Sequence, residues 1–159
     1  MVERLAAVLH AASVAPIRGH DFTAVAVDPA SIHLLSGANQ PANTAEGDDP
    51  VRLWVAPDQV MIVAFSAPAR PDGDFVSDIT DGQAIWRMSG GNVDAVLAMG
   101  TTLDPDLLAP GRCAQTIFAG VRALIYQHDG AMYLQVERPL AAFMADWLTQ
   151  AATALEGMS

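Results

Sequence analysis

Lysine is absent from this chain, and all eight of its basic residues are arginine. The absence excludes mechanisms that depend on a lysine amine. These are Schiff-base formation, a lysine general base and the lysine of a phosphate-binding loop.

Cysteine is almost as scarce, because Cys113 stands alone. A single cysteine forms no internal disulfide, and no spacing of cysteine and histidine resembles a zinc or iron–sulfur site. We therefore expect a fold without a disulfide or a structural metal. A reducing cytoplasm is the expected location.

Long apolar runs and an excess of positive charge are also missing. The N-terminal stretch contains Glu3, Arg4 and His10 and lacks the apolar core of a signal peptide. No segment reaches the roughly 18 uncharged apolar residues that a transmembrane helix needs. The formal net charge of −10 would repel phosphate backbones and anionic lipid surfaces. Neither nucleic acid nor a membrane is expected as a partner.

The chain does have enough apolar material for one core. It has 159 residues, of which 52% are hydrophobic, and a chain of about 150 residues buries roughly 70% of the surface that unfolding exposes. We expect a single domain over residues 21–159. Residues 1–20 are expected to form an arm, with Leu5, Val8 and Leu9 on one helical face before Pro16 interrupts it.

Short β-prone runs dominate the expected domain, and turn residues separate them. The predicted strands are 22–29, 31–37, 51–55, 60–65, 75–80, 83–90, 113–120, 121–129 and 131–137. Pro57-Asp58 and Asp81-Gly82 each predict a β-hairpin. Residues 38–50 and 67–74 are predicted loops, and Ala119-Gly120 and Asp129-Gly130 predict a three-stranded meander.

Two helices complete the expected α+β fold, an antiparallel sheet with helices packed on one face. The first spans 92–99 and buries Val93, Val96 and Leu97, with Gly100 as its C-cap. The second starts near Pro139, ends near Gly157 and repeats apolar residues at steps of three and four. These are Leu140, Phe143, Met144, Trp147, Leu148, Ala151 and Leu155.

Candidate chemical groups are scattered. The histidines at positions 10, 20, 33 and 128 lie in different predicted elements, without a second ligand at metal-binding spacing. We expect these histidines to lie at surface or turn positions. Cys113 follows Arg112 and could be an activated thiol, but a buried strand cysteine is the favoured interpretation.

Glycines and carboxylates give no specific pattern either. Ser89-Gly90-Gly91 at a helix start could present N–H groups to an anion, although a strand-to-helix turn that needs small residues is favoured. Asp78 and Asp81 could form a carboxylate pair, but their position around a turn favours capping. The aspartates at 48, 49, 72, 74, 104 and 106 are expected in solvated loops, without regular calcium-ligand spacing. The residues predict no catalytic, cofactor-binding or metal site.

Several motifs between Val51 and Leu148 resemble a known family. They are Trp54-x-x-Pro-Asp58, Asp78-Ile-Thr80, the turn at Ser89, Leu103-Asp104 and the run Pro110-Gly-x-Cys-Ala-x-Thr116. Together they resemble the gamma subunit of heterotetrameric sarcosine oxidase. The pattern is similar, more distantly, to the folate-binding fold of the glycine cleavage T-protein. One departure is Ser89-Gly-Gly-Asn92, where the family more often has Ser-Gly-Pro, and the long N-terminal portion is another.

The resemblance implies a reduced folate-domain-like module that packs on an alpha subunit in sarcosine catabolism. FAD, FMN, NAD, folate and zinc are then expected in the alpha, beta and delta partner subunits, with none in this chain. Related demethylating complexes have a similar gamma subunit, so the N-methyl amine stays open. A stand-alone folate-binding aminomethyltransferase-like protein is the alternative, and a plain ligand-binding or scaffold domain is a third possibility.

Overall fold

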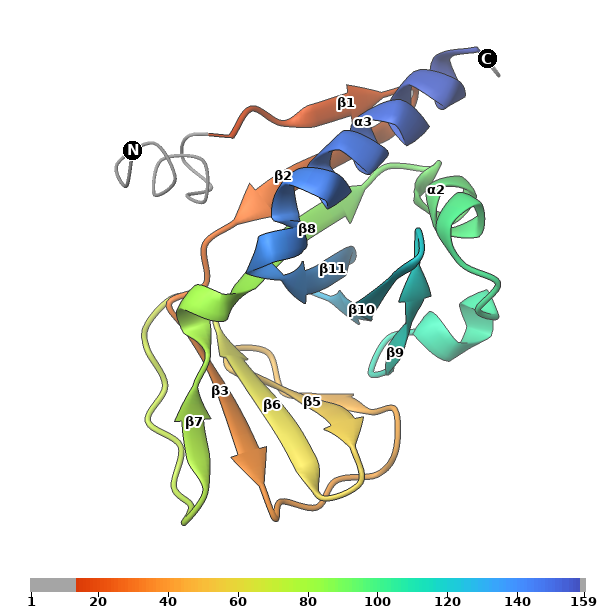
Figure 1. The fold of residues 1–159 in the computed structure, drawn as a ribbon. Helices are drawn as coiled ribbons and strands as arrows, with labels where there is room; N and C mark the ends of the chain where they lie inside the picture. The colour runs from red at the N-terminus through yellow and green to blue at the C-terminus, as the bar shows by residue number, and fades with distance from the viewer. Residues whose placement is uncertain (1–13, 158–159) are drawn as a thin grey trace.

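The expected α+β class is confirmed, and the fold contains two antiparallel sheets (Figure 1). The computed structural model describes residues 14–157. Most of the predicted arm, with Leu5, Val8, Leu9 and His10, lies outside the described residues. Its last part, Ile17–Gly19, forms the edge strand β1 of the larger sheet.

The larger sheet has six strands in the order β1-β2-β8-β11-β10-β9. After β1, its strands are β2 (Phe22–Val27), β8 (Gln83–Ser89), β9 (Cys113–Phe118), β10 (Val121–His128) and β11 (Ala131–Glu137). The smaller sheet has five strands in the order β4-β5-β6-β3-β7. Its strands are β3 (Ser31–Ser36), β4 (Ala45–Glu46), β5 (Val51–Ala56), β6 (Gln59–Ala64) and β7 (Val76–Asp78).

Local turn signals located three of the antiparallel pairs correctly. Strands β5 and β6 form the hairpin predicted at Pro57-Asp58, where Asp58 has a φ of 60°. Strands β9, β10 and β11 form the predicted meander, with Ala119 and Asp129 also at positive φ before their glycines. Asp58 and Asp129 tolerate left-handed backbone because their side chains are short and polar, and Gly120 and Gly130 adopt it without a steric penalty.

The hairpin predicted at Asp81-Gly82 is wrong. Both flanking strands exist, but β7 pairs with β3 in the smaller sheet, whereas β8 lies between β2 and β11 in the larger one. The segment between them is a 3₁₀ turn, η2 (Thr80–Gly82). A two-residue turn signal describes only local backbone, and pairing with strands about 50 residues away overrode it. The turn carries the chain from one sheet to the other.

The larger sheet is buried on both faces. One face packs against the helices through Trp86, Met88, Ile125 and Leu134, among others. The opposite face packs against the smaller sheet and contributes Ile85, Leu124, Tyr126 and Tyr133 to a second cluster. Helices on one face were expected from the sequence, but the second sheet on the other face was not. The near-continuous apolar runs of β8 and β10 are the pattern that burial on both faces requires.

The two predicted helices are present at nearly the predicted bounds. Helix α2 (Val93–Gly100) buries Val93, Val96 and Leu97 as expected. The 3₁₀ turns η3 (Pro105–Leu108) and η4 (Arg138–Leu140) precede β9 and α3 (Ala141–Glu156) respectively. Helix α3 lies along β1 and across the larger sheet (Figure 1).

Helix α3 buries a narrower stripe than its sequence suggests. Met144, Leu148, Ala151 and Leu155 are buried. Phe143 was expected on the same face, but it is 47% exposed. Trp147 is half-buried and packs edge to face on Phe118, with ring centroids 4.8 Å apart.

Replacing Trp147 by alanine should lower the free energy of unfolding by about 2–3 kcal/mol. That is less than the ~3–5 kcal/mol typical of a fully buried aromatic, because Trp147 is only partly buried. Urea unfolding measures the difference. Phe143→Ala, one helical turn away and largely exposed, is the matched control, with an expected loss below about 1 kcal/mol. An unchanged unfolding midpoint in Trp147→Ala would show that this ring does not hold α3 on the sheet.

Candidate functional site

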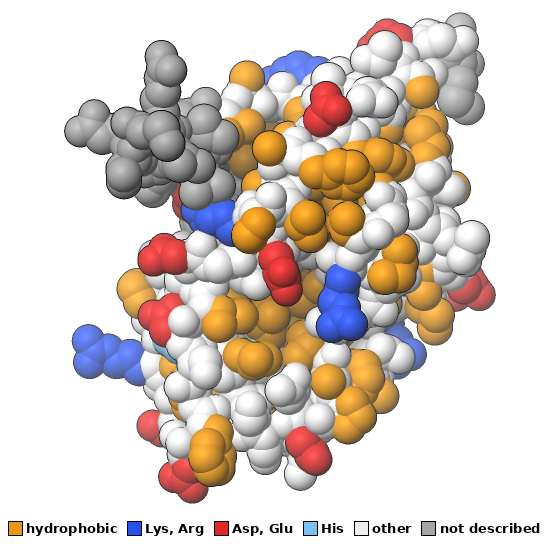
Figure 2. Space-filling model, in the orientation of Figure 1, with side chains coloured by type: hydrophobic (Ala, Val, Ile, Leu, Met, Phe, Trp, Pro, Cys, Tyr) orange, Lys and Arg blue, Asp and Glu red, His pale blue; other side chains and the backbone are white. Residues whose placement is uncertain are grey.

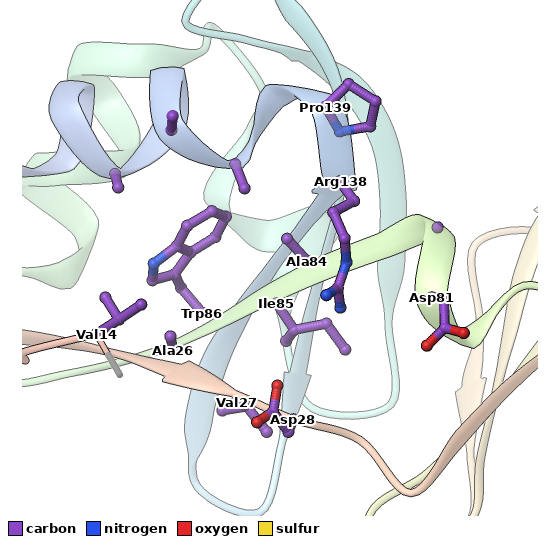
Figure 3. Close-up of a pocket in the computed structure, with 14 residues that line it drawn as sticks. Val14, Ala26, Val27, Asp28, Asp81, Ala84, Ile85, Trp86, Arg138 and Pro139 are labelled. Atoms are coloured by element: carbon purple, nitrogen blue, oxygen red, sulfur yellow. The ribbon is translucent and has the colours of Figure 1, made fainter. Parts of the chain in front are cut away.

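A cavity of about 680 Å³ lies between strands β2 and β8 and the first turns of α3. Figure 3 shows Trp86 at its centre, beneath the helix, with Arg138 and Pro139 towards one end and Val14 towards the other. Its size lies within the range of small-molecule sites, about 300–1,000 Å³.

Small residues keep the cavity open. The sheet contributes Ala26 and Ala84, and α3 contributes Ala141, Ala142 and Ala145. On the same helix, Met144 and Leu148 are fully buried in the core between helix and sheet. Facing alanines at one end of a helix–sheet interface leave a gap because the backbones are held apart by the larger side chains at the other end.

The rim of the cavity is charged. Arg138 Nε and Nη2 donate hydrogen bonds to the backbone oxygen of Gln83, at 3.1 and 2.8 Å. The carboxylate-bearing residues Asp28 and Asp81 line the same hollow. The rim therefore carries one formal positive and two formal negative charges around an apolar interior.

The indole of Trp86 has an unusual polar feature. The residue is 4% exposed, and its Nε1 has no hydrogen-bond partner in the described part of the chain. A buried donor without a partner typically costs about 1–3 kcal/mol. Trp86 is therefore the buried polar group most in need of an acceptor near the cavity.

A buried polar network lies behind the rim. Gln135 on β11 is 1% exposed and donates from Nε2 to Met61 Sδ at 3.0 Å and to Gln83 Oε1 at 3.1 Å. Its own Oε1 accepts from the Tyr126 hydroxyl at 3.3 Å. Burial raises the pKa of Tyr126 well above its usual value. The network is neutral and fixes Gln83, whose backbone oxygen positions Arg138.

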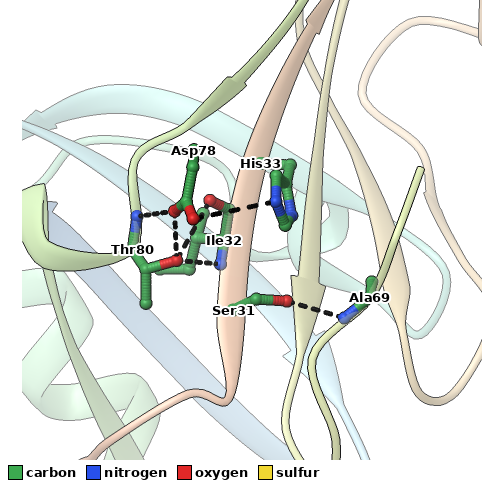
Figure 4. A network of polar contacts seen from close by, with 6 residues as sticks. All are labelled: Ser31, Ile32, His33, Ala69, Asp78 and Thr80. Carbon is green, nitrogen blue, oxygen red and sulfur yellow. Dashed lines mark hydrogen bonds and ion pairs between the residues drawn. The ribbon is translucent and has the colours of Figure 1, made fainter. Parts of the chain in front are cut away.

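Asp78 and His33 form the polar contact shown in Figure 4. The Asp78 carboxylate accepts hydrogen bonds from the Thr80 hydroxyl at 2.6 Å and from the Thr80 backbone N–H at 3.0 Å. These bonds, with a smaller contribution from His33 at 3.9 Å, lower the pKa of Asp78. Asp78 thus caps the η2 turn, as the sequence suggested. Asp81 and Asp78 both line a second hollow of about 520 Å³ beside Glu137.

The glycines at Ser89-Gly90-Gly91 serve the turn and do not form an anion site. Gly90 has a φ of 111°, and a Cβ on it would collide with the backbone of Asp21. A Cβ on Gly91 would collide with the Asp21 carboxylate. Asn92 donates from Nδ2 to the His20 backbone oxygen at 2.8 Å. The β1–β2 turn, with its own carboxylate, therefore occupies the place an anion would need.

The remaining candidates also have structural roles. The Cys113 thiol donates to the backbone oxygens of Thr44 and Trp54, at 3.2 and 3.3 Å, and burial raises its pKa to about 11. His128 stacks on Phe65 with centroids 5.2 Å apart. The favoured interpretation of Cys113 as a buried strand cysteine fits these contacts.

Two loop aspartates are more ordered than expected. Hydrogen bonds from the Ser66 hydroxyl and from the backbone N–H groups of Phe65 and Ser66 lower the pKa of Asp49, which ties its loop to the end of β6. Asp104 accepts from the Asp106 backbone N–H and caps η3. Over residues 14–157, no three His, Cys, Asp or Glu side chains gather closely enough to hold a metal ion. In the same range, no helix is long and apolar enough to cross a membrane.

Fold and cavity together define a two-sheet α+β module in which two helices cover one face of the larger sheet. Among solved structures, the chain is similar to a chain of the heterotetrameric sarcosine oxidase from Corynebacterium sp. U-96, determined in complex with pyrrole 2-carboxylate. The TM-score is 0.72 at 17% identity, over 96% of this chain and 93% of that chain. The resemblance stated from the sequence is thus confirmed at the level of the fold. No family model and no curated protein matches the sequence.

No sequence pattern indicates the cavity. Its lining comes from four segments, around positions 14, 27, 84 and 141, and five of its 14 members are alanines. Alanine is common in any core, so it marks a hollow only when the opposite residue is known. Trp86 could be assigned to a strand from its pattern, but the missing partner of its Nε1 is a property of the packed structure.

Gly90→Ala should destabilise the fold by about 2–3 kcal/mol, because the added methyl group meets the Asp21 backbone and the positive φ disfavours alanine. Thermal unfolding provides the measurement. Gly82→Ala is the control, since a Cβ there has open space and the backbone is not left-handed. Equal melting temperatures for the two variants would mean that the turn rearranges freely.

Cys113 should resist iodoacetamide at pH 8 in the folded protein. The reactive species is the thiolate, and with a pKa of about 11 only about one thiol in a thousand is ionised at that pH. Mass spectrometry after timed alkylation measures the modified fraction. The control is the same reaction in concentrated urea, which unfolds the protein and exposes the thiol. Rapid alkylation without urea would contradict a buried, protonated thiol.

The raised pKa of Cys113 also fixes the sign of its effect on stability. The folded state favours the neutral thiol. The stabilisation of the folded state that Cys113 contributes is therefore fully present below the ordinary thiol pKa of 9.0 and is lost as the pH rises through about 11.

Proposed function

We propose that this chain is a non-catalytic gamma-type subunit of a heterotetrameric, flavin-dependent complex of the sarcosine oxidase type, located in the cytoplasm. The complex would oxidatively demethylate sarcosine or a related N-methyl amine. The chain would contribute to assembly and stability by packing on the alpha-type subunit. FAD, FMN, NAD, folate and zinc would be bound by the alpha, beta and delta partners.

The observation that carries this proposal is the fold similarity. It extends over 93% of a chain from a heterotetrameric sarcosine oxidase, so almost no part of that chain lacks a counterpart here. The motifs between Trp54 and Thr116 point to the same kind of subunit independently of the coordinates.

The roles of the candidate residues agree with an accessory subunit. Cys113 is buried and protonated, Asp78 caps a turn, and Gly90 and Gly91 accommodate the Asp21 turn. These groups thus hold the fold together.

A subunit interface needs apolar surface, and helix α3 offers some. Phe143 is 47% exposed, and the half-buried Trp147 lies one turn along the same helix. Figure 2 shows apolar side chains gathered on the upper part of this face and in a recess below, with charged side chains between and around them. Stable interfaces are apolar at their centre and polar at the rim. We therefore place the contact with the alpha-type subunit on this side of α3.

The test is affinity purification of the tagged chain from its native cells. Three partner polypeptides and a flavin absorbance spectrum are expected in the purified material. Phe143→Ser should reduce the recovered partners by at least about tenfold, a change of roughly 1.4 kcal/mol. Phe75→Ser is the matched control, because Phe75 is 70% exposed but lies next to the polar loop that contains Asp72 and Asp74.

A colourless chain that purifies alone would overturn the proposal. Titration with folate tests the alternative that the chain is a stand-alone folate-binding protein. No binding is expected at micromolar concentration, because folate carries carboxylates and the cavity rim already has two carboxylates beside one guanidinium.

A further inference from the structure

The hollow beside α3 is an apolar surface that the described residues leave partly uncovered. It measures about 680 Å³. Both of its walls carry partly exposed alanines, with Ala26 and Ala84 on the sheet and Ala141 and Ala145 on the helix. A packed domain ordinarily has few voids of this size, and apolar surface gains free energy when it leaves water. A further apolar segment would therefore be stabilised in this place.

The chain itself reaches the hollow at Val14. Val14 is the first described residue and lines the hollow. Figure 3 shows it on the side away from Asp81. The 13 residues that precede Val14 are thus attached at the edge of the hollow. Attachment at this point gives them a high effective concentration beside the apolar walls.

The sequence of these residues has the pattern of an amphipathic helix. At roughly 100° per residue, Leu5, Val8 and Leu9 fall on one side of such a helix. Glu3 and His10 fall on the opposite side. Large apolar side chains pack well where the facing element offers small ones. The leucines and the valine therefore complement walls made of alanine.

The lengths of the segment and the hollow also agree. The helix wall of the hollow runs from Pro139 to Ala145, which is about 9 Å at ~1.5 Å per residue. The apolar stripe of the segment begins nine residues before Val14, or about 13 Å along a helix. Such a helix would span the hollow and bring Arg4 towards the carboxylate of Asp81. Opposite charges at that end favour this direction along the hollow.

We propose that residues 2–13 form a helix that docks in this hollow, with Leu5, Val8 and Leu9 against the alanines of the sheet and of α3. The occupant is a segment of the same chain, and its docking extends the apolar packing between α3 and the larger sheet. The inference does not depend on the proposed subunit role, because the hollow and the segment both belong to this chain.

Disulfide trapping in the full chain tests the docked position. Val8→Cys is combined with Ala142→Cys, because Ala142 is an exposed part of the lining and a disulfide needs Cα atoms within about 7 Å. Under mild oxidation this bridge should form at least about tenfold faster than the bridge between Val8→Cys and Ala154→Cys. Ala154 is exposed on the same helix, about 18 Å from Ala142. Cys113 is buried and does not compete.

Serine substitutions test the apolar side of the segment. Leu5→Ser with Leu9→Ser should release the segment and slow the bridge to Ala142→Cys by about tenfold, a change of roughly 1.4 kcal/mol. Without the cysteine substitutions, the same pair should raise the fluorescence of the hydrophobic dye ANS at least about twofold, because the hollow becomes accessible. Ala7→Ser with His10→Ser is the matched control on the opposite side, and neither reading should change.

Three outcomes would overturn the proposal. Equal rates of bridge formation at positions 142 and 154 would mean that the segment has no preferred place on the helix. Bridges that join two chains, detected by intact mass, would make a second copy the occupant. An ANS signal that the leucine substitutions leave unchanged would mean that the segment does not cover the hollow.

Discussion

Burial of the six-stranded sheet on both faces is the constraint on which the rest of this structure depends. Strand β10 shows it residue by residue, because Ala123 and Ile125 face the helices whereas Leu124 and Tyr126 face the smaller sheet. A strand of this kind cannot alternate apolar and polar residues, and each face needs its own cover. Helices α2 and α3 cover one face, and the smaller sheet covers the other. The η2 turn follows from the same constraint, since the chain must pass between the sheets.

The parts of this fold that could be predicted from sequence are those decided by neighbouring residues. Pro57-Asp58 and Asp129-Gly130 each join strands that pair with each other, so turn chemistry and pairing agree there. Asp81-Gly82 joins strands that belong to different sheets, and the same kind of signal predicted the wrong pairing. Strand β2 pairs with β8 across about 60 residues of chain. No local pattern encodes that choice, because it depends on which apolar faces remain to be covered.

The candidate site divides in the same way. Cys113 and Asp78 could be interpreted correctly as structural residues from their positions in a strand and a turn. The glycines at 90 and 91 could be assigned to a turn, but the identity of the crowding group, Asp21, is a matter of tertiary packing. The cavity could not be predicted, since a hollow is defined by the residues on both of its walls and those residues are far apart in sequence.

The neutral network behind the cavity explains how one end of the helix–sheet interface can stay open without disturbing the rest. Gln135 is held by Tyr126, Met61 and Gln83, so its hydrogen bonds connect β10 and β11 with the smaller sheet and the start of β8. A buried network with satisfied partners fixes one arrangement of its members. Gln83 then presents its backbone oxygen to Arg138 immediately before α3 begins. The first turn of α3 is thereby positioned by hydrogen bonds, whereas Met144, Leu148 and Leu155 position the remainder by apolar contact. Because these two anchors act at different places along the chain, the helix is held at both while the small side chains of Ala141 and Ala145 leave space beside the sheet.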